Sequence, residues 1–161
     1  MGERPISPTA VYSARPTVRI DQQSYAKVTE LLIGMDMTEQ EGGLSTLQLR
    51  LSNVASDPSG GASFGFEDGA IVTLGKSISV HAGPVSSPIE IFRGTIMGLE
   101  AEFREEGPPE LVILAEDAAQ QARMARRTKT YDDMSLADLG RVVADRLGLQ
   151  PVVTGLTDRV G

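Results

Sequence analysis

Alternating apolar and polar residues in the first two thirds of the chain predict antiparallel strands. Leu47, Leu49 and Leu51 alternate with polar residues, as in a strand that buries one face. Residues 28–37 repeat this period, and their inward side chains are expected to be Leu31, Ile33, Met35 and Met37. The glycine-containing turn at 39–43 joins the two runs, which predicts a hairpin.

The longest strand is expected over residues 89–103, where Leu99, Ala101 and Phe103 alternate with charged residues and are expected to form its buried face. Ile96 lies out of phase with that set. A β-bulge near Gly94 or Gly98 would account for the slip. After a turn that contains two prolines, the continuous apolar run 111–115 predicts a strand buried on both faces.

Two shorter runs, at 17–20 and 72–82, complete the expected strands. About six strands joined by short turns predict a mostly β fold, a small antiparallel barrel followed by a helical addition. The loop 53–69 is expected to lack regular structure. Its aromatic residues Phe64 and Phe66 either grip a partner or fold back over the barrel end, and the second reading is favoured.

Helices are predicted after the last strand. Ser135 and Asp138 form a capping box, and the apolar stripe of the helix is expected to comprise Leu136, Leu139, Val143 and Leu147. Gly148 supplies the left-handed position that ends such a helix. A shorter helix is expected after Asp117, as its N-cap. The predicted organisation is a flexible arm at 1–15, a barrel at 16–127 and the start of a helical insertion at 128–161.

Composition narrows the function classes. The net charge of −7 argues against a nucleic-acid footprint, and the absence of cysteine excludes disulfides and thiolate metal sites. No apolar run approaches a membrane span, and the first residues lack a signal peptide, so a soluble chain is expected. The local basic cluster, which includes Arg126 and Arg127, is a candidate partner contact, but a solvated helix end and turn is the favoured reading because the surroundings are acidic.

Candidate chemistry is sparse. His81 is the only histidine and has no evident catalytic or metal-binding neighbour in the sequence. Glu100 and Glu102 lie about 7 Å apart on one strand face, a spacing that an inverting glycan hydrolase could use. Because no aromatic wall accompanies them, simple strand alternation explains both. No catalytic residue, cofactor or metal is predicted, and the chain is expected not to be an enzyme.

Four segments resemble the phage late control gene D protein family: residues 91–99, 114–117, 126–139 and 146–149. The best-defined match runs through Thr130-Tyr-Asp-Asp-Met-Ser135 into the predicted helix. This family includes baseplate hub proteins of contractile tails and is similar to the hub part of type VI valine-glycine-repeat spike proteins. The resemblance implies a barrel of the tail-tube and hub type. Family members are about twice as long as this chain, so only the first barrel and the start of the insertion are expected here.

The resemblance implies a structural hub module that joins tail tube to spike, with tube and spike proteins as partners and a homotrimer in the full-length assembly. It also implies a cytoplasmic protein that later enters the tail baseplate or injection particle. Glu90, Glu100 and Glu102 are then expected either to face the central channel or to meet bulk solvent on the outside of the assembly; the sequence favours neither. The alternative, from a different class, is a stand-alone binding barrel that presents loop 53–69 to a protein or ligand.

Overall fold

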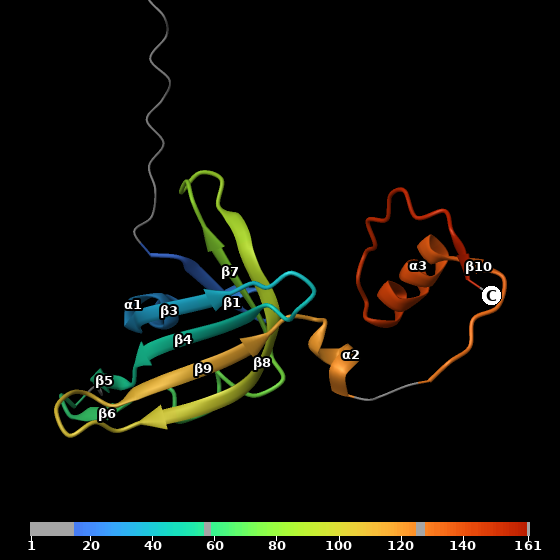
Figure 1. Cartoon of the computed structure of the whole chain (residues 1–161). Helices are drawn as coiled ribbons and strands as arrows, with labels where there is room; N and C mark the ends of the chain where they lie inside the picture. The colour runs from blue at the N-terminus through green and yellow to red at the C-terminus, as the bar shows by residue number, and fades with distance from the viewer. Residues whose placement is uncertain (1–14, 57–58, 125–127, 161) are drawn as a thin grey trace, which may run out of the picture. The chain divides into compact units, whose positions relative to one another are not determined.

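The computed structural model describes residues 15–56, 59–124 and 128–160 (Figure 1). The chain packs as two compact units, unit 1 (Met1–Asp117) and unit 2 (Ala118–Gly161). The sequence-based boundary between residues 127 and 128 adjoins a segment outside the described residues and stays a prediction. The expected arm at 1–15 also lies almost entirely outside them.

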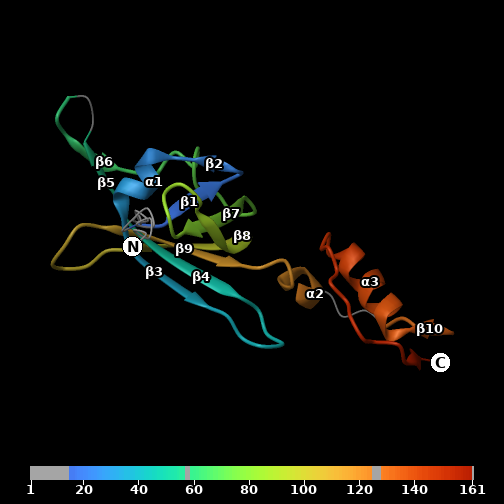
Figure 2. The same ribbon diagram turned by 90° about the horizontal axis from the view of Figure 1, so that it is seen from above.

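Unit 1 is built on a seven-stranded antiparallel sheet in the order β2-β1-β7-β8-β9-β4-β3 (Figures 1 and 2). Its strands are β1 (Thr17–Ile20), β2 (Gln23–Ser24), β3 (Leu32–Thr38), β4 (Thr46–Ser52), β7 (Ser77–Ala82), β8 (Ile89–Glu102) and β9 (Glu110–Glu116). The predicted β3–β4 hairpin is confirmed, with Met35 opposite Leu49. Two short strands, β5 (Val54–Ser56) and β6 (Ala62–Phe64), form a separate hairpin.

The sheet does not close into the barrel that the sequence predicted. Its two ends are β2 and β3, and no ladder joins them within the described residues. A helix, α1 (Ala26–Leu31), connects these end strands, and its Val28 is fully buried. The guanidinium of Arg15 donates hydrogen bonds to the carbonyls of Thr29 and Glu30, at 3.2 and 3.0 Å. A packed helix therefore lies between the ends of the sheet, and the mostly β class is confirmed in an open form.

The helix α1 also corrects the predicted run 28–37. Residues 28–31 are helical, so the strand begins at Leu32, which is buried. The register of β3 against β4 shifts between Leu32 and Gly34, and the extra residue, Ile33, is 55% exposed. A period-two pattern of four residues cannot by itself separate a strand from a single helical turn.

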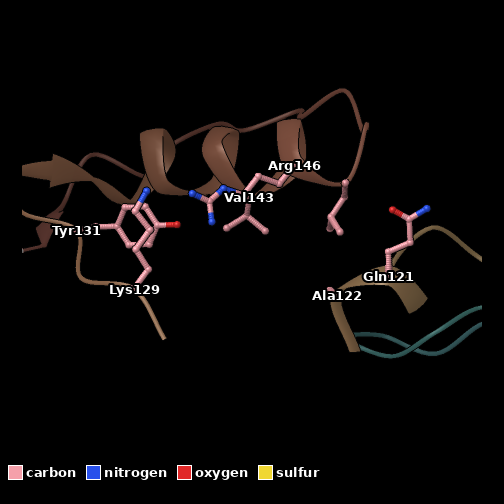
Figure 3. A pocket seen from close by; sticks show the side chains of 7 residues that line it. Gln121, Ala122, Lys129, Tyr131, Val143 and Arg146 are labelled. Atoms are coloured by element: carbon pink, nitrogen blue, oxygen red, sulfur yellow. The ribbon is translucent and has the colours of Figure 1, made fainter. Parts of the chain in front are cut away.

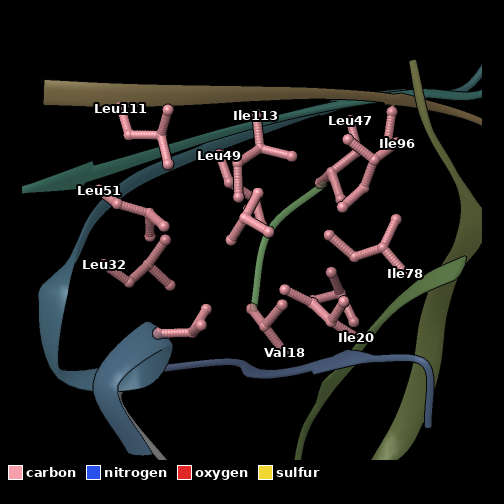
Figure 4. Close-up of a cluster of buried hydrophobic side chains, with 14 of the residues drawn as sticks. Val18, Ile20, Leu32, Leu47, Leu49, Leu51, Ile78, Ile96, Leu111 and Ile113 are labelled. Atoms are coloured by element: carbon pink, nitrogen blue, oxygen red, sulfur yellow. The ribbon is translucent and has the colours of Figure 1, made fainter. Parts of the chain in front are cut away.

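The core of unit 1 follows the alternation read from the sequence. Leu47, Leu49 and Leu51 are buried, as predicted, and the run in β9 is buried on both faces, because Val112 is as inaccessible as Ile113. Figure 4 shows the core side chains pointing toward one another between the strands and α1. The core also contains Val18, Ile20, Val28, Leu32, Phe66, Val72, Ile78, Val80, Phe92, Ile96, Leu111 and Ala115.

The predicted bulge in β8 is present at Gly98, where the register against β9 shifts between Ile96 and Gly98. A second register shift against β7 falls between Val80 and His81, which leaves Ile91 as the extra residue on β8. The bulge at Gly98 puts Leu99, opposite the buried Ile113, in phase with the core face. The strand nevertheless runs beyond the core, as described below.

The segment 53–69 differs from the predicted structureless loop, because β5 and β6 pair within it. Phe66 folds back into the core, as the favoured reading expected, and Lys27 lies 5.3 Å from its ring centroid. Phe64 stays exposed. Farther along, only Ser77–Ala82 of the predicted run 72–82 is a strand: Val72 is buried outside a strand and Leu74 is exposed.

Unit 2 contains α2 (Gln120–Met124), α3 (Leu136–Arg146) and a short pair of strands, β10 (Met134–Ser135) and β11 (Arg159–Val160). The predicted cap of α3 is confirmed, because the Asp138 N–H donates to Ser135 Oγ at 3.1 Å. Gly148 has φ 66° and closes the helix as expected. No side chain in residues 118–124 or 128–159 is buried.

Asp117 does not directly precede a helix, since α2 begins three residues later, at Gln120. Its carboxylate accepts a hydrogen bond from the Ser45 N–H at 2.8 Å, and its own N–H donates to the Ser45 carbonyl at 3.0 Å. These two bonds tie the chain after β9 to the start of β4.

Replacing Ser135 with alanine is expected to destabilise α3 by about 1 kcal/mol, because the N-cap hydrogen bond is lost. Amide hydrogen exchange across 136–146 should then accelerate. Ser135→Asn retains a side-chain acceptor and should leave exchange close to that of the parent chain. Equal exchange in the alanine variant and the parent would contradict a stabilising cap.

Candidate functional site

The second half of β8 has a free edge in the described part of unit 1. The β7–β8 ladder ends at the Ser77–Thr95 pair, while β9 continues beside β8 as far as Glu102. Ile96 is the last residue that bonds on the β7 side: its N–H donates to the Lys76 carbonyl at 2.9 Å. Beyond it, residues 97–102 pair with β9 alone. We call this segment, with the side chains at its rim, the β8 edge.

Apolar side chains lie along the β8 edge on the same face of the sheet as the core. Phe103 is 70% exposed, Phe64 is 42% exposed and Leu99 is 37% exposed. The two aromatic rings meet edge to face, with centroids 6.1 Å apart. Leu99, Ala101 and Phe103 were predicted to be buried, which is wrong: all three are exposed, and β7 does not continue beside this end of β8. The rim is an apolar patch of the kind that proteins usually cover with another chain.

Charged side chains line the opposite face of the same segment. Glu102 pairs with Arg104 at 2.8 Å, and Arg104 reaches Glu110 at 3.5 Å. Glu110 is buried, and it accepts hydrogen bonds from Arg50 Nε at 3.0 Å and from the terminal nitrogen at 2.5 Å. Hydrogen bonding to Glu110, together with its negative charge, raises the pKa of Arg50. The network joins β4, the end of β8 and β9 across the face away from the core.

Glu100 is exposed on this face, opposite Val112, and makes no ion pair within the described residues. The sequence had singled out Glu100 and Glu102 as a candidate carboxylate pair. The structure places both on the face away from the core, where the second is engaged by Arg104. A hydrolytic role remains a hypothesis that rests on their spacing alone.

Glu90 lies near the other end of β8, also on the face away from the core. Arg93 donates two hydrogen bonds to its carboxylate, at 2.8 and 2.5 Å, and His81 Nε2 lies 3.5 Å away. The hydrogen bonding by Arg93 is the main reason that the pKa of Glu90 is lowered; partial burial acts in the opposite direction. The Nδ1 atom of His81 is buried and has no hydrogen-bond partner among the residues that the structure describes.

Unit 2 carries a surface hollow of about 380 Å³ (Figure 3). Its lining comes from α2, from the segment before β10 and from the last turns of α3: Gln121, Ala122, Lys129, Tyr131, Val143, Arg146 and Leu147. Lys129 Nζ lies 5.0 Å from the ring centroid of Tyr131. The predicted contact residues Arg126 and Arg127 lie outside the described residues.

Phe64 and the glutamates were candidates from the sequence, whereas the free edge was not predicted. The structure shows the edge in the strand lengths, with 14 residues in β8 and six in β7. The sequence had predicted a longer partner run, 72–82, which hid the difference. The hollow of unit 2 left no signal in the sequence, since its lining residues are spread over 27 positions and share no period.

The described part of the chain contains no cluster of three or more metal-ligating side chains. Within the same residues, none of the helices is both long and apolar enough to cross a lipid bilayer.

Comparison with known proteins identifies a related fold. The chain is similar to the 43 kDa tail protein of prophage MuSo2 from Shewanella oneidensis, with a TM-score of 0.53 and 13% identity. The match covers 91% of this chain and 44% of the tail protein, so this chain spans less than half of that protein's length. At this identity the likeness concerns the fold, which is that of a phage tail protein.

No curated protein matches the chain. A family model does: the Alg8 N-terminal domain model matches residues 48–159, which include most of the sheet and nearly all of unit 2. Because the match extends over more than half of the sequence, the chain belongs to the Alg8 N-terminal domain family.

Proposed function

We propose that the chain is a non-catalytic structural module of a contractile phage tail or a related injection particle. Its place would be the baseplate hub, between tail tube and spike. The observation that carries this proposal is the free β8 edge with its apolar rim, in a fold shared with a prophage tail protein. Such an edge is a liability in a monomer and a ready interface in an assembly.

The proposed partners are tube and spike proteins together with further copies of the chain, as a homotrimer in the full-length protein. The resemblance of residues 126–139 to late control gene D proteins supports a hub in particular. The proposal includes neither sequence-specific nucleic-acid contacts nor a membrane. The protein would be made in the cytoplasm and would then be built into the particle.

We also propose that the acidic face of β8 lines the channel of the assembled hub. Glu90, Glu100 and Glu102 all project from the face away from the core, which supports a common environment for the three carboxylates. A negatively charged wall would repel nucleic-acid phosphates and so prevent passing cargo from adhering.

The test uses particles purified from cells that make a tagged full-length protein. The tag is expected at the baseplate end in electron micrographs. Particles with both Glu100→Lys and Glu102→Lys should assemble but deliver DNA or protein about tenfold less efficiently, because the net charge of the channel wall rises by four per copy relative to the parent. Delivery per particle is the measurement.

The matched control is Glu39→Lys with Glu41→Lys, which changes the charge equally in the exposed turn between β3 and β4. Absence of the tag from purified particles, or its distribution along the tube, would refute the hub assignment. Normal delivery by the Glu100 and Glu102 variant, with the tag at the baseplate, would refute only the channel wall.

A second candidate function is a stand-alone binding module, favoured by the exposure of Phe64 on the β5–β6 hairpin. This function would be distinguished from the hub by one measurement: the isolated chain would bind its partner while the chain itself stays monomeric. Phe66 cannot take part in such binding, because it lies in the core.

A further inference from the structure

The apolar stripe of α3 is incompletely covered within unit 2. Val143 is 44% exposed, and no side chain in residues 118–124 or 128–159 is buried. The hollow lies over the C-terminal half of this stripe, where Val143 and Leu147 contribute apolar surface (Figure 3). The stripe therefore presents a partly open apolar surface at the hollow.

The charged residues that line the hollow are both positive. Lys129 stands on one side, beside the Tyr131 ring, and Arg146 points in from α3 (Figure 3). Within the described residues Arg146 makes no ion pair, whereas Arg141 on the same helix pairs with Asp138 at 2.7 Å. The guanidinium of Arg146 is thus available to a carboxylate that is not part of the described chain.

Charge is also segregated along the whole sequence. Residues 118–161 hold seven of the 15 basic residues but only five of the 22 acidic ones. Unit 2 is therefore basic within an acidic chain, and its hollow attracts negatively charged ligands more strongly than the net charge of −7 suggests.

The lining favours a peptide over a small molecule. Every lining side chain is exposed or half-buried, so the hollow is a surface depression, whereas small-molecule sites bury most of their ligand. A volume of about 380 Å³ accommodates one large apolar side chain with the backbone on either side of it. Flanking carboxylates on that backbone would then reach Lys129 and Arg146.

We infer that this hollow is a docking site for an acidic segment of a partner protein, with one bulky apolar residue between carboxylates. The apolar residue rests on Val143 and Leu147, and the carboxylates pair with Lys129 and Arg146. This site is separate from the β8 edge and does not depend on the channel proposal.

The test measures the fluorescence anisotropy of a labelled pentapeptide, Glu-Glu-Phe-Glu-Glu, as the complete chain is added. Binding is expected to be specific to this peptide over versions with four lysines or with a central alanine. Arg146→Glu or Lys129→Glu should weaken binding by about fivefold each, because each replaces an attractive charge with a repulsive one. Amide NMR shifts on addition of the peptide should centre on residues 129–131 and 143–147.

The matched control is Arg141→Glu, which alters net charge equally but does not line the hollow. If circular dichroism shows that a charge reversal disturbs the helix, the milder variants Arg146→Gln and Lys129→Gln replace the reversals in the binding test. The inference is overturned by equal weakening in the Arg141 variant, by equal binding of the lysine peptide, or by no binding at millimolar concentration. Sedimentation that shows Arg146-dependent self-association, with no peptide bound, would instead identify a second copy as the occupant and overturn it too.

Discussion

Replacing Leu49 with alanine is expected to lower the free energy of unfolding by about 2 to 5 kcal/mol. Leu49 is fully buried at the middle of β4, and it faces Met35 on one neighbouring strand and Ile113 on the other. Removing its isobutyl group both loses apolar burial and leaves a cavity that a sheet held on both sides cannot collapse to fill.

Denaturant unfolding followed by circular dichroism measures this loss. The control is Leu74→Ala, which removes the same atoms from a side chain that is 59% exposed and should cost less than about 0.5 kcal/mol. A loss that small for Leu49→Ala would show that β4 does not form the centre of the core.

The variant Gly94→Ala is expected to destabilise unit 1 by about 1 to 3 kcal/mol or more, because of overpacking. A Cβ built at Gly94 would overlap the backbone oxygen of Glu116 and would lie 2.9 Å from the Phe92 ring. The ring can rotate, but the carbonyl belongs to β9, whose pairing with β8 begins at this point. The strands must therefore separate locally to admit a methyl group.

The control for Gly94→Ala is Gly34→Ala in β3, where the nearest atom to the added Cβ is the Arg50 side chain at 3.8 Å. That contact is ordinary, so the midpoint of denaturant unfolding should stay within experimental error of the parent's. Similar midpoints for the two alanine variants would contradict the steric argument.

The sequence predicted those parts of the fold that local alternation determines. Leu47, Leu49 and Leu51 alternate without interruption, and each is buried. The bulge at Gly98 was predictable because a one-residue slip reverses which residues face the core. The Ser135 cap was predictable because its hydrogen bond spans only three residues.

What the sequence missed depends on neighbours that are remote in the chain. The alternation of Leu99 with Glu100 is correct in phase, but burial also depends on the neighbouring strand, and the β7 ladder stops at Thr95. Barrel closure likewise depended on how β2 and β3 are joined. The six-residue helix between them has no side-chain cap, so nothing in the sequence marked its start. The candidate site lies at these open places, so it emerged only with the structure.

Because β4 pairs with β9, part of the core of unit 1 can form only some time after β4 has been synthesised. Leu51 meets Leu111, and Thr46 meets Glu116, so the two interior strands are separated by roughly 60 residues of intervening chain. At about 5–20 residues per second, a ribosome needs roughly 3 to 12 seconds to add that segment. During this interval one side of β4 has no partner strand, and Leu47, Leu49 and Leu51 lack the β9 residues that complete their core. Slowing translation after β4 has left the ribosome and before β9 has left it should therefore increase the amount of nascent chain held by chaperones, while slowing it once β9 has left should not.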